Sequence, residues 1–277
     1  MVSARTRNRI LRSRFLRLIV LGPRILIGIR HAGSHLSAVV KWLFRSAEFT
    51  NYSYPLSPRN LRHLEGFVSV VSGCSTEEAS AYMREILENE EFRNHIRSQI
   101  STSRRGVEMD QSIHVARRAG WYATIRATKP NVLVETGTDK GLGSCVIAEA
   151  IRRNGVGHLY TIDIEPESGF LIGNKYSELI TRITGDSVKH LADLKNVDWF
   201  IHDSDHSAEH EAAEFSAITP NLNEGALLLS DNAHVTDVLA DWSRAHSRPF
   251  LYFQEVPANH WYSGAGIGAS WMTRDAT

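Results

Sequence analysis

The spacing of hydrophobic and polar positions changes near Pro130. Before it, apolar residues recur every three or four positions, which is typical of amphipathic helices. Ser75 and Glu78 form a capping box at the start of one such helix. The apolar positions that follow are Ala79, Tyr82, Met83, Ile86 and Leu87, and then Phe92, Ile96 and Ile100. The same spacing predicts another helix over 111–127, so a helical region is expected over 51–125.

After Pro130 short apolar runs alternate with helical stretches, and several of the runs end in an acidic residue or glycine. The runs are NVLVETG (131–137), HLYTIDI (158–164), ITGDS (183–187), VDWFIHDSDH (197–206), GALLLSDN (225–232), PFLYFQEV (249–256) and GIGASWM (266–272). This alternation predicts a doubly wound, Rossmann-like α/β sheet over residues 126–277, with the helical region as an N-terminal extension. Ligands of such sheets collect at the carboxyl ends of the strands.

The chain has 277 residues, of which 42% are hydrophobic, enough for one enzyme domain and a smaller appendage. Its two cysteines, Cys74 and Cys145, cannot make a disulfide framework. They favour a reducing, cytoplasmic location.

A basic arm at residues 1–50 is concealed by the balance of 31 basic and 31 acidic residues. The arm holds ten basic residues and one acid, Glu48, which gives +9 and leaves 21 − 30 = −9 for the rest. Its apolar run is interrupted by Arg17, Pro23 and Arg24, which argues against both a membrane-spanning helix and a signal peptide. A solvated tail, a transit peptide, a docking segment and peripheral contact with an anionic membrane through residues 1–45 remain open.

The first strand ends in VETGTDKGLGS, a glycine-bearing turn before a helix. Gly137 and Gly141, with Thr138 between them, allow a ligand to approach the backbone closely. A dinucleotide-binding G-x-G-x-x-G pattern would need a second glycine where Asp139 stands. Glu135, two residues before the turn, suits a ligand with a positive centre better than a pyrophosphate.

The next two strands also end in acids. Asp163 could accept hydrogen bonds from both hydroxyls of a ribose. Asp186 could accept from an exocyclic adenine amine, with Ser187 beside it. A nicotinamide-dependent oxidoreductase would share the ribose acid, but three successive acidic strand ends favour S-adenosylmethionine.

The fourth and fifth strands lead into a further polar set. Neighbouring strands lie about 4.8 Å apart, so Asp203 and Asp231 could converge if these strands are adjacent. With Asn232 they would form an oxygen site suited to Mg²⁺, and His206 would be the base for an acceptor hydroxyl. The structural alternative is that these residues are helix caps and loop residues, and we favour the metal and base.

A zinc site made of His202, His206 and His210 is a second hypothesis for the same segment. It needs one continuous helix over 202–210, whereas the pattern makes His202 the end of a strand. The geometry therefore disfavours zinc.

Residues from about 117 to 240 resemble the class I S-adenosylmethionine-dependent methyltransferases, especially the macrocin-type and catechol-type metal-dependent O-methyltransferases. VETGTDKGLGS resembles their first motif, LYTIDIEP the ribose motif, TGDS the adenine motif, and WFIHDSDHSAEH with LLLSDN the metal and base region. In the catechol-type enzymes Asp, Asp and Asn hold magnesium at a similar separation, and the base stands three residues after the first Asp, as His206 does here. Asp139 and Lys140 replace residues that are small in many relatives, and residues 1–105 are not covered.

The resemblance implies an enzyme that methylates a hydroxyl of a small molecule: a natural product, sugar or glycolipid. Its cofactors would be S-adenosyl-L-methionine and Mg²⁺, and no nucleic-acid partner is expected. A non-catalytic scaffold, an NAD-dependent oxidoreductase and a membrane-associated glycolipid methyltransferase remain as alternatives. A homo-oligomer is also left open.

Overall fold

The computed structural model describes residues 21–46 and 53–272. This part of the chain divides into two compact units, one made of residues 21–46 and 259–262 and the other of 53–258 and 263–272. The larger unit contains both the helical region and the sheet. Residues 1–20 of the predicted basic arm lie outside the described residues.

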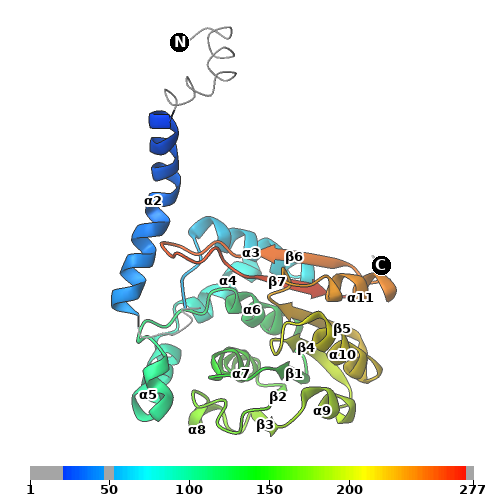
Figure 1. Ribbon diagram of the computed structural model, residues 1–277. Coiled ribbons are helices and arrows are strands. Elements are labelled where there is room, and N and C mark those ends of the chain that lie inside the picture. The colour runs from blue at the N-terminus through cyan, green and yellow to red at the C-terminus, as the bar shows by residue number, and fades with distance from the viewer. Residues whose placement is uncertain (1–20, 47–52, 273–277) are drawn as a thin grey trace. The chain divides into compact units, whose positions relative to one another are not determined.

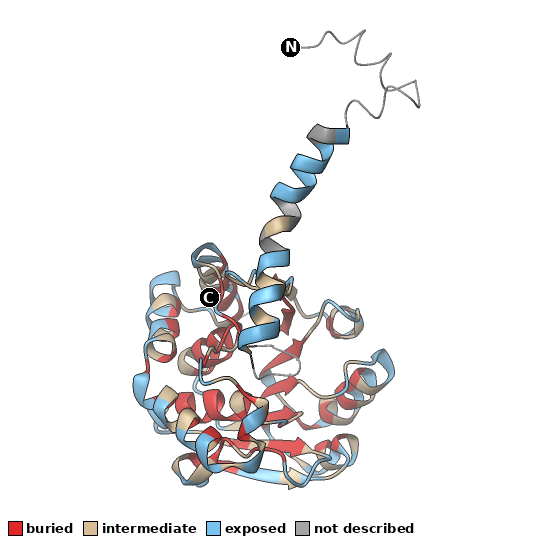
Figure 2. Cartoon of the chain, turned by 60° about the vertical axis from the view of Figure 1, so that its left-hand side comes forward, coloured by how far each residue is buried: buried red, intermediate tan, exposed pale blue. Residues whose placement is uncertain are grey.

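The smaller unit is dominated by one long helix, α2 (Leu21–Arg45) (Figure 1). Most of its described side chains are exposed, and Figure 2 shows the helix mainly in the exposed colour. None of the helices within the described ranges combines the length and apolar character needed to cross a bilayer.

The helical region of the larger unit contains α3 (Pro58–Ser72), α4 (Thr76–Leu87), α5 (Glu90–Thr102), the 3₁₀ helix η2 (Arg104–Glu108) and α6 (Arg118–Thr128). The capping box before α4 is confirmed: the Ser75 hydroxyl accepts from the Glu78 amide, and the Glu78 carboxylate accepts from the Ser75 amide. The buried faces of α4 and α5 include six of the predicted apolar residues, namely Ala79, Met83, Ile86, Phe92, Ile96 and Ile100.

The helix predicted over 111–127 is wrong over residues 111–117. Helix α6 begins only at Arg118, because Ala116 adopts a left-handed backbone conformation with φ of 46°. That turn interrupts the helical path and directs Arg117 toward the sheet, where its backbone amide donates to Glu255.

All seven predicted runs contribute a strand: β1 (Val132–Thr136), β2 (His158–Asp163), β3 (Ile180–Thr184), β4 (Val197–His202), β5 (Leu222–Asp231), β6 (Phe250–Gln254) and β7 (Gly266–Ser270). They form one sheet in the order β3-β2-β1-β4-β5-β7-β6. The first five strands are parallel, and β7 is antiparallel to both β5 and β6. The predicted doubly wound α/β fold is therefore confirmed.

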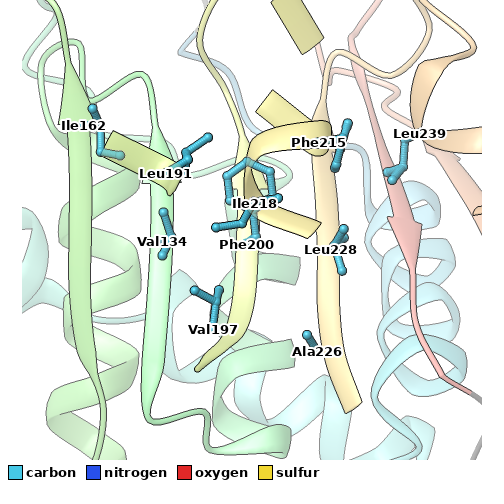
Figure 3. Packing of buried hydrophobic residues seen from close by; sticks show 10 residues of the cluster. All are labelled: Val134, Ile162, Leu191, Val197, Phe200, Phe215, Ile218, Ala226, Leu228 and Leu239. Atoms are coloured by element: carbon cyan, nitrogen blue, oxygen red, sulfur yellow. The ribbon is translucent and has the colours of Figure 1, made fainter. Parts of the chain in front are cut away.

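The helices between the strands are α7 (Leu142–Asn154), α8 (Gly173–Tyr176), α9 (Ser187–Asp193), α10 (Ala208–Ile218) and α11 (Val238–Ala245), with the 3₁₀ helix η3 (Thr219–Asn221) before β5. Figure 3 shows the core on one face of the sheet, where Val134, Phe200 and Leu228 of three neighbouring strands meet Leu191 of α9 and Phe215 of α10. Side chains alternate along a strand, so Glu135 points to the opposite face, where it meets α7.

Candidate active site

The first of two adjoining cavities lies at the carboxyl ends of β2 and β3 and has a volume of about 770 Å³. Asp163, Asp186 and Ser187, predicted for the ribose and adenine, all line it. Asp163 already accepts from the backbone amides of Asp139 and Glu165, each at 2.8 Å. Asp186 also caps α9 by accepting from the Val188 amide at 3.0 Å. These contacts orient both carboxylates while leaving part of each exposed to the cavity.

The second cavity, of about 400 Å³, lies at the ends of β1, β4 and β5. It shares Gly137, Asp139 and Asp203 with the first cavity. The predicted site residues on its wall are Glu135, Gly137, Thr138, Asp203, His206, Asp231 and Asn232. The carboxyl edge of the sheet thus brings together predicted cofactor-binding residues of the first turn, the predicted metal ligands and the predicted base.

Glu135 is a buried carboxylate on the wall of this second cavity. Ser144 and Thr161 both donate hydroxyl hydrogen bonds to its Oε2 atom. Burial raises the pKa of Glu135 to about 7, and these hydrogen bonds lower it only in part. A cationic ligand group beside Glu135 would therefore stabilise its ionised form.

The two glycines of the first turn have different tasks. Gly137 has φ of 85°, and a Cβ atom there would lie 2.0 Å from the backbone oxygen of Asp203. It therefore lets the turn after β1 approach the end of β4 closely. Gly141, with φ of 93°, precedes α7 and lies against Gly169. It lines neither cavity, so a direct contact between Gly141 and a ligand stays a prediction.

Asp231 is held by an arginine that the sequence interpretation overlooked. Nε and Nη2 of Arg117 each donate to one carboxylate oxygen of Asp231, and Nη1 donates to Glu255 at 3.0 Å. All three side chains are at least 95% buried. Although burial opposes it, the charge of Arg117 holds the pKa of Asp231 well below its usual range. Tyr54 also donates to Glu255 at 2.6 Å, which connects the helical region to this cluster.

Asp203 lacks such a close partner. Its Oδ2 atom lies 3.7 Å from Nη2 of Arg118. Burial and the adjacent Asp231 raise the pKa of Asp203 well above its ordinary value. This carboxylate would consequently ionise more readily if another positive charge approached.

His206 faces the two carboxylates from the segment between β4 and α10. Its Nε2 atom accepts from the Asn232 amide nitrogen at 2.8 Å and lies 4.0 Å from Oδ1 of Asp203. Burial lowers the pKa of His206 below 6.5, so the ring is neutral at pH 7. Asn232 adopts a left-handed conformation with φ of 54°, which carries its side chain to the cavity directly after β5.

The donor set of this cavity fits a divalent cation. Ligand atoms of Asp203, His206 and Asp231 lie within 4.8 Å of one another. The surroundings hold four carboxylates (Glu135, Asp203, Asp231, Glu255) and two guanidinium groups (Arg117, Arg118), which leaves two negative charges in excess if all are ionised. Both oxygens of Asp231 already receive hydrogen bonds, so it would use its remaining lone pairs.

The chain that forms these cavities was compared with known proteins. Residues 134–233 match a family model described as a methyltransferase domain. The chain contains an S-adenosylmethionine-dependent methyltransferase domain. This result decides against the nicotinamide-dependent oxidoreductase. No curated protein sequence matches the chain significantly.

Solved structures share the fold of this methyltransferase domain at low sequence identity. The O-methyltransferase TomG from Streptomyces achromogenes, in complex with SAM, is 18% identical with a TM-score of 0.50, covering 65% of this chain and 90% of its own. The O-methyltransferase from Bacillus cereus, in complex with SAH, is 12% identical with a TM-score of 0.51, covering 74% and 99%. Cofactor-bound Rv0187 from MTB is 13% identical with a TM-score of 0.55, covering 69% and 94%.

The other two histidines of the domain's His-rich segment contact Glu214 instead of joining the cluster of His206, Asp203 and Asp231. His202 ends β4, as predicted, and its Nδ1 atom is 2.7 Å from Glu214 of α10. His210 is 2.9 Å from the same carboxylate through Nε2. Among the described residues, the group able to hold a metal contains His206 with Asp203 and Asp231, so the three-histidine zinc arrangement is not formed.

Arg118, the first residue of α6, is another residue of the second cavity that the sequence pattern did not indicate. Its guanidinium lies 5.2 Å from the centroid of the Trp121 ring and lines the second cavity. Its Nε atom is buried and finds no hydrogen-bond partner among the described residues. An unpaired buried donor of this kind is suited to an anionic ligand group.

Proposed function

We propose that the chain is an O-methyltransferase that acts on a hydroxyl group of a small molecule. The observation that carries this proposal is a neutral histidine, His206, whose Nε2 atom faces Asp203 and Asn232 inside a cavity beside Glu135. A neutral imidazole is a base suited to removing a hydroxyl proton at neutral pH. TomG and the Bacillus cereus protein are themselves described as O-methyltransferases, which agrees with this choice.

S-adenosylmethionine supplies a methyl group already activated by the positive charge on its sulfur. Asp163 and Asp186 would bind the hydroxyl and amine groups of its adenosine part in the larger cavity. Glu135 would accept from its ammonium group. Arg118 would donate to its carboxylate, because the buried Nε of Arg118 otherwise lacks a partner. These contacts would fix the direction in which the methyl group points.

Mg²⁺ would be held by Asp203, Asp231 and Asn232, and it would lower the pKa of an acceptor hydroxyl. Arg117 fixes the orientation of Asp231 within this set. His206 would take the hydroxyl proton on Nε2 as the oxygen attacks the methyl carbon, whose bond to sulfur would break to release S-adenosylhomocysteine. For this, Nε2 must exchange its hydrogen bond from Asn232 for one from the acceptor.

The test incubates the chain with S-adenosylmethionine and a panel of sugars, phenols and polyketides, with Mg²⁺ present or chelated, and measures the S-adenosylhomocysteine that is formed. We expect turnover that requires Mg²⁺ and is lost in Asp203→Asn, while calorimetry shows that S-adenosylmethionine binding persists. Asp193→Asn is the matched control, because Asp193 is an exposed carboxylate at the end of α9.

Two results would contradict the proposal in different ways. Turnover that survives both chelation and Asp203→Asn would remove the metal from the mechanism. Binding of S-adenosylmethionine without turnover on the whole panel would favour the non-catalytic scaffold.

A further inference from the structure

Helix α2 is amphipathic along its whole length. At 100° per residue, eight exposed apolar side chains fall within an arc of about 140° on one side of the helix. These residues are Leu21, Ile25, Leu26, Ile29, Leu36, Val40, Leu43 and Phe44. Their exposed fractions range from 47% for Val40 to 85% for Phe44. Such a continuous exposed apolar face is unusual on a soluble surface and marks an interaction site.

Apart from Ile27, the exposed side chains on the rest of the helix circumference are polar or cationic. Arg24, Arg30, Lys41 and Arg45 all lie outside the apolar arc and are exposed. The helix contains no acidic residue, and residues 1–50 contain only one, Glu48. A surface that binds this helix must therefore supply negative charge beside an apolar layer.

Contacts within the smaller unit leave the apolar arc uncovered. Trp42 points away from the arc, and its ring lies 5.1 Å from that of Trp261. This aromatic contact with the 259–262 segment therefore lies on the side of the helix opposite the arc. The arc itself needs a partner from outside the unit.

We propose that α2 lies in the surface of an anionic lipid bilayer. The apolar arc would enter the boundary between headgroups and acyl chains, while Arg24, Arg30, Lys41 and Arg45 contact phosphate groups. The described helix lacks the character needed to span the bilayer, which leaves a position parallel to its surface. Pairing with a second copy is disfavoured, because two helices that carry only positive charges repel each other beside a shared apolar seam. This inference concerns the helix alone and is independent of the proposed acceptor.

The experiment is flotation of the full chain with vesicles of phosphatidylcholine, with and without phosphatidylglycerol. We expect the chain to float with the anionic vesicles and to remain unbound with the neutral ones. Leu36→Ser should weaken binding roughly tenfold, because one buried leucine no longer contributes to the apolar contact. The matched control is Ile27→Ser, which removes an equally exposed apolar side chain outside the arc and should leave binding nearly unchanged.

A charge variant tests the other half of the proposal. Arg30→Gln combined with Lys41→Gln should weaken binding to anionic vesicles roughly fivefold for each charge removed. Methyltransferase folding is checked in all variants by S-adenosylmethionine binding, which should not change.

Three outcomes would overturn the proposal. The first is a chain that does not float with anionic vesicles, and the second is equal binding to neutral and anionic vesicles. The third is a lipid-free dimer, seen by analytical ultracentrifugation, that Leu36→Ser dissociates. That last result would assign the arc to a second copy of the chain instead.

Discussion

Glu135 offers a sharp test of how the cavity is charged before any ligand binds. Its carboxylate is buried, and its pKa is raised to about 7 from an ordinary value of 4.5. At 1.36 kcal/mol per pH unit, that difference corresponds to about 3 kcal/mol. The folded protein therefore binds the Glu135 proton more tightly than the unfolded chain does. This contribution to stability is complete below pH 4.5 and is lost as the pH rises to about 7.

Glu135→Gln should remove this loss. Its amide oxygen can still accept from Ser144 and Thr161, which both donate to Oε2 in the native protein. Relative to the native chain, the variant should gain up to about 3 kcal/mol in free energy of unfolding between pH 4.5 and pH 8. Urea denaturation at both pH values measures the change. Calorimetry on the same variant should show weaker S-adenosylmethionine binding.

The matched control is Glu149→Gln, because Glu149, on α7, is another fully buried carboxylate. Burial raises its pKa, but hydrogen bonding and charge from Arg152 outweigh this and leave the pKa below its ordinary value. Its replacement should therefore destabilise the protein at pH 8, the opposite sign to Glu135→Gln. The reasoning would be refuted if the free energies of unfolding of the native chain and Glu135→Gln differed by the same amount at pH 4.5 and at pH 8.

Three further predictions concern the base, the buried ion pairs and the helix α2. His206→Ala should abolish turnover but keep S-adenosylmethionine binding. In the native chain the rate of turnover should fall only below pH 6.5, because burial lowers the pKa of His206. A fall in rate centred above pH 6.5 would contradict this assignment. Arg117→Met should cost about 3–5 kcal/mol in urea denaturation, because Asp231 and Glu255 would be left buried without their cation; a smaller loss than for an exposed control, Arg244→Met, would be inconsistent. Gly28→Ala should strengthen vesicle binding a few-fold in the flotation assay, because a Cβ there meets nothing within 4 Å and alanine favours the helix; unchanged binding would mean that helix formation does not limit association.

The strands and their carboxyl-end residues could be predicted because their signal is local. Runs such as VLVET and DWFIH are apolar, short and bounded by turns, and parallel strands bring their ends to one edge. That rule was enough to expect Asp203, His206 and Asn232 in one place. The structure brings them together in the second cavity.

Arg117 and Glu255 could not be found in this way. They are 138 positions apart, and their contact depends on the order of β5, β7 and β6 in the sheet. The turn at Ala116 was equally hidden, because alanine is the residue that most favours a helix. Tertiary contacts of Arg117 override that local preference and leave no trace in the spacing of apolar residues.

The position of β7 has a consequence for how the chain is made. Although β7 is the last strand in the sequence, it lies between β5 and β6 and pairs Ile267 with Asp231. During synthesis the edge of β5 therefore stays open after nearly the whole domain has left the ribosome. A nascent chain that stalls before residue 266 would expose this edge to pairing with other chains. Pairing of β7 with β5 completes the sheet beside Asp231, so the last step of sheet formation and the assembly of the proposed metal site depend on the same pairing.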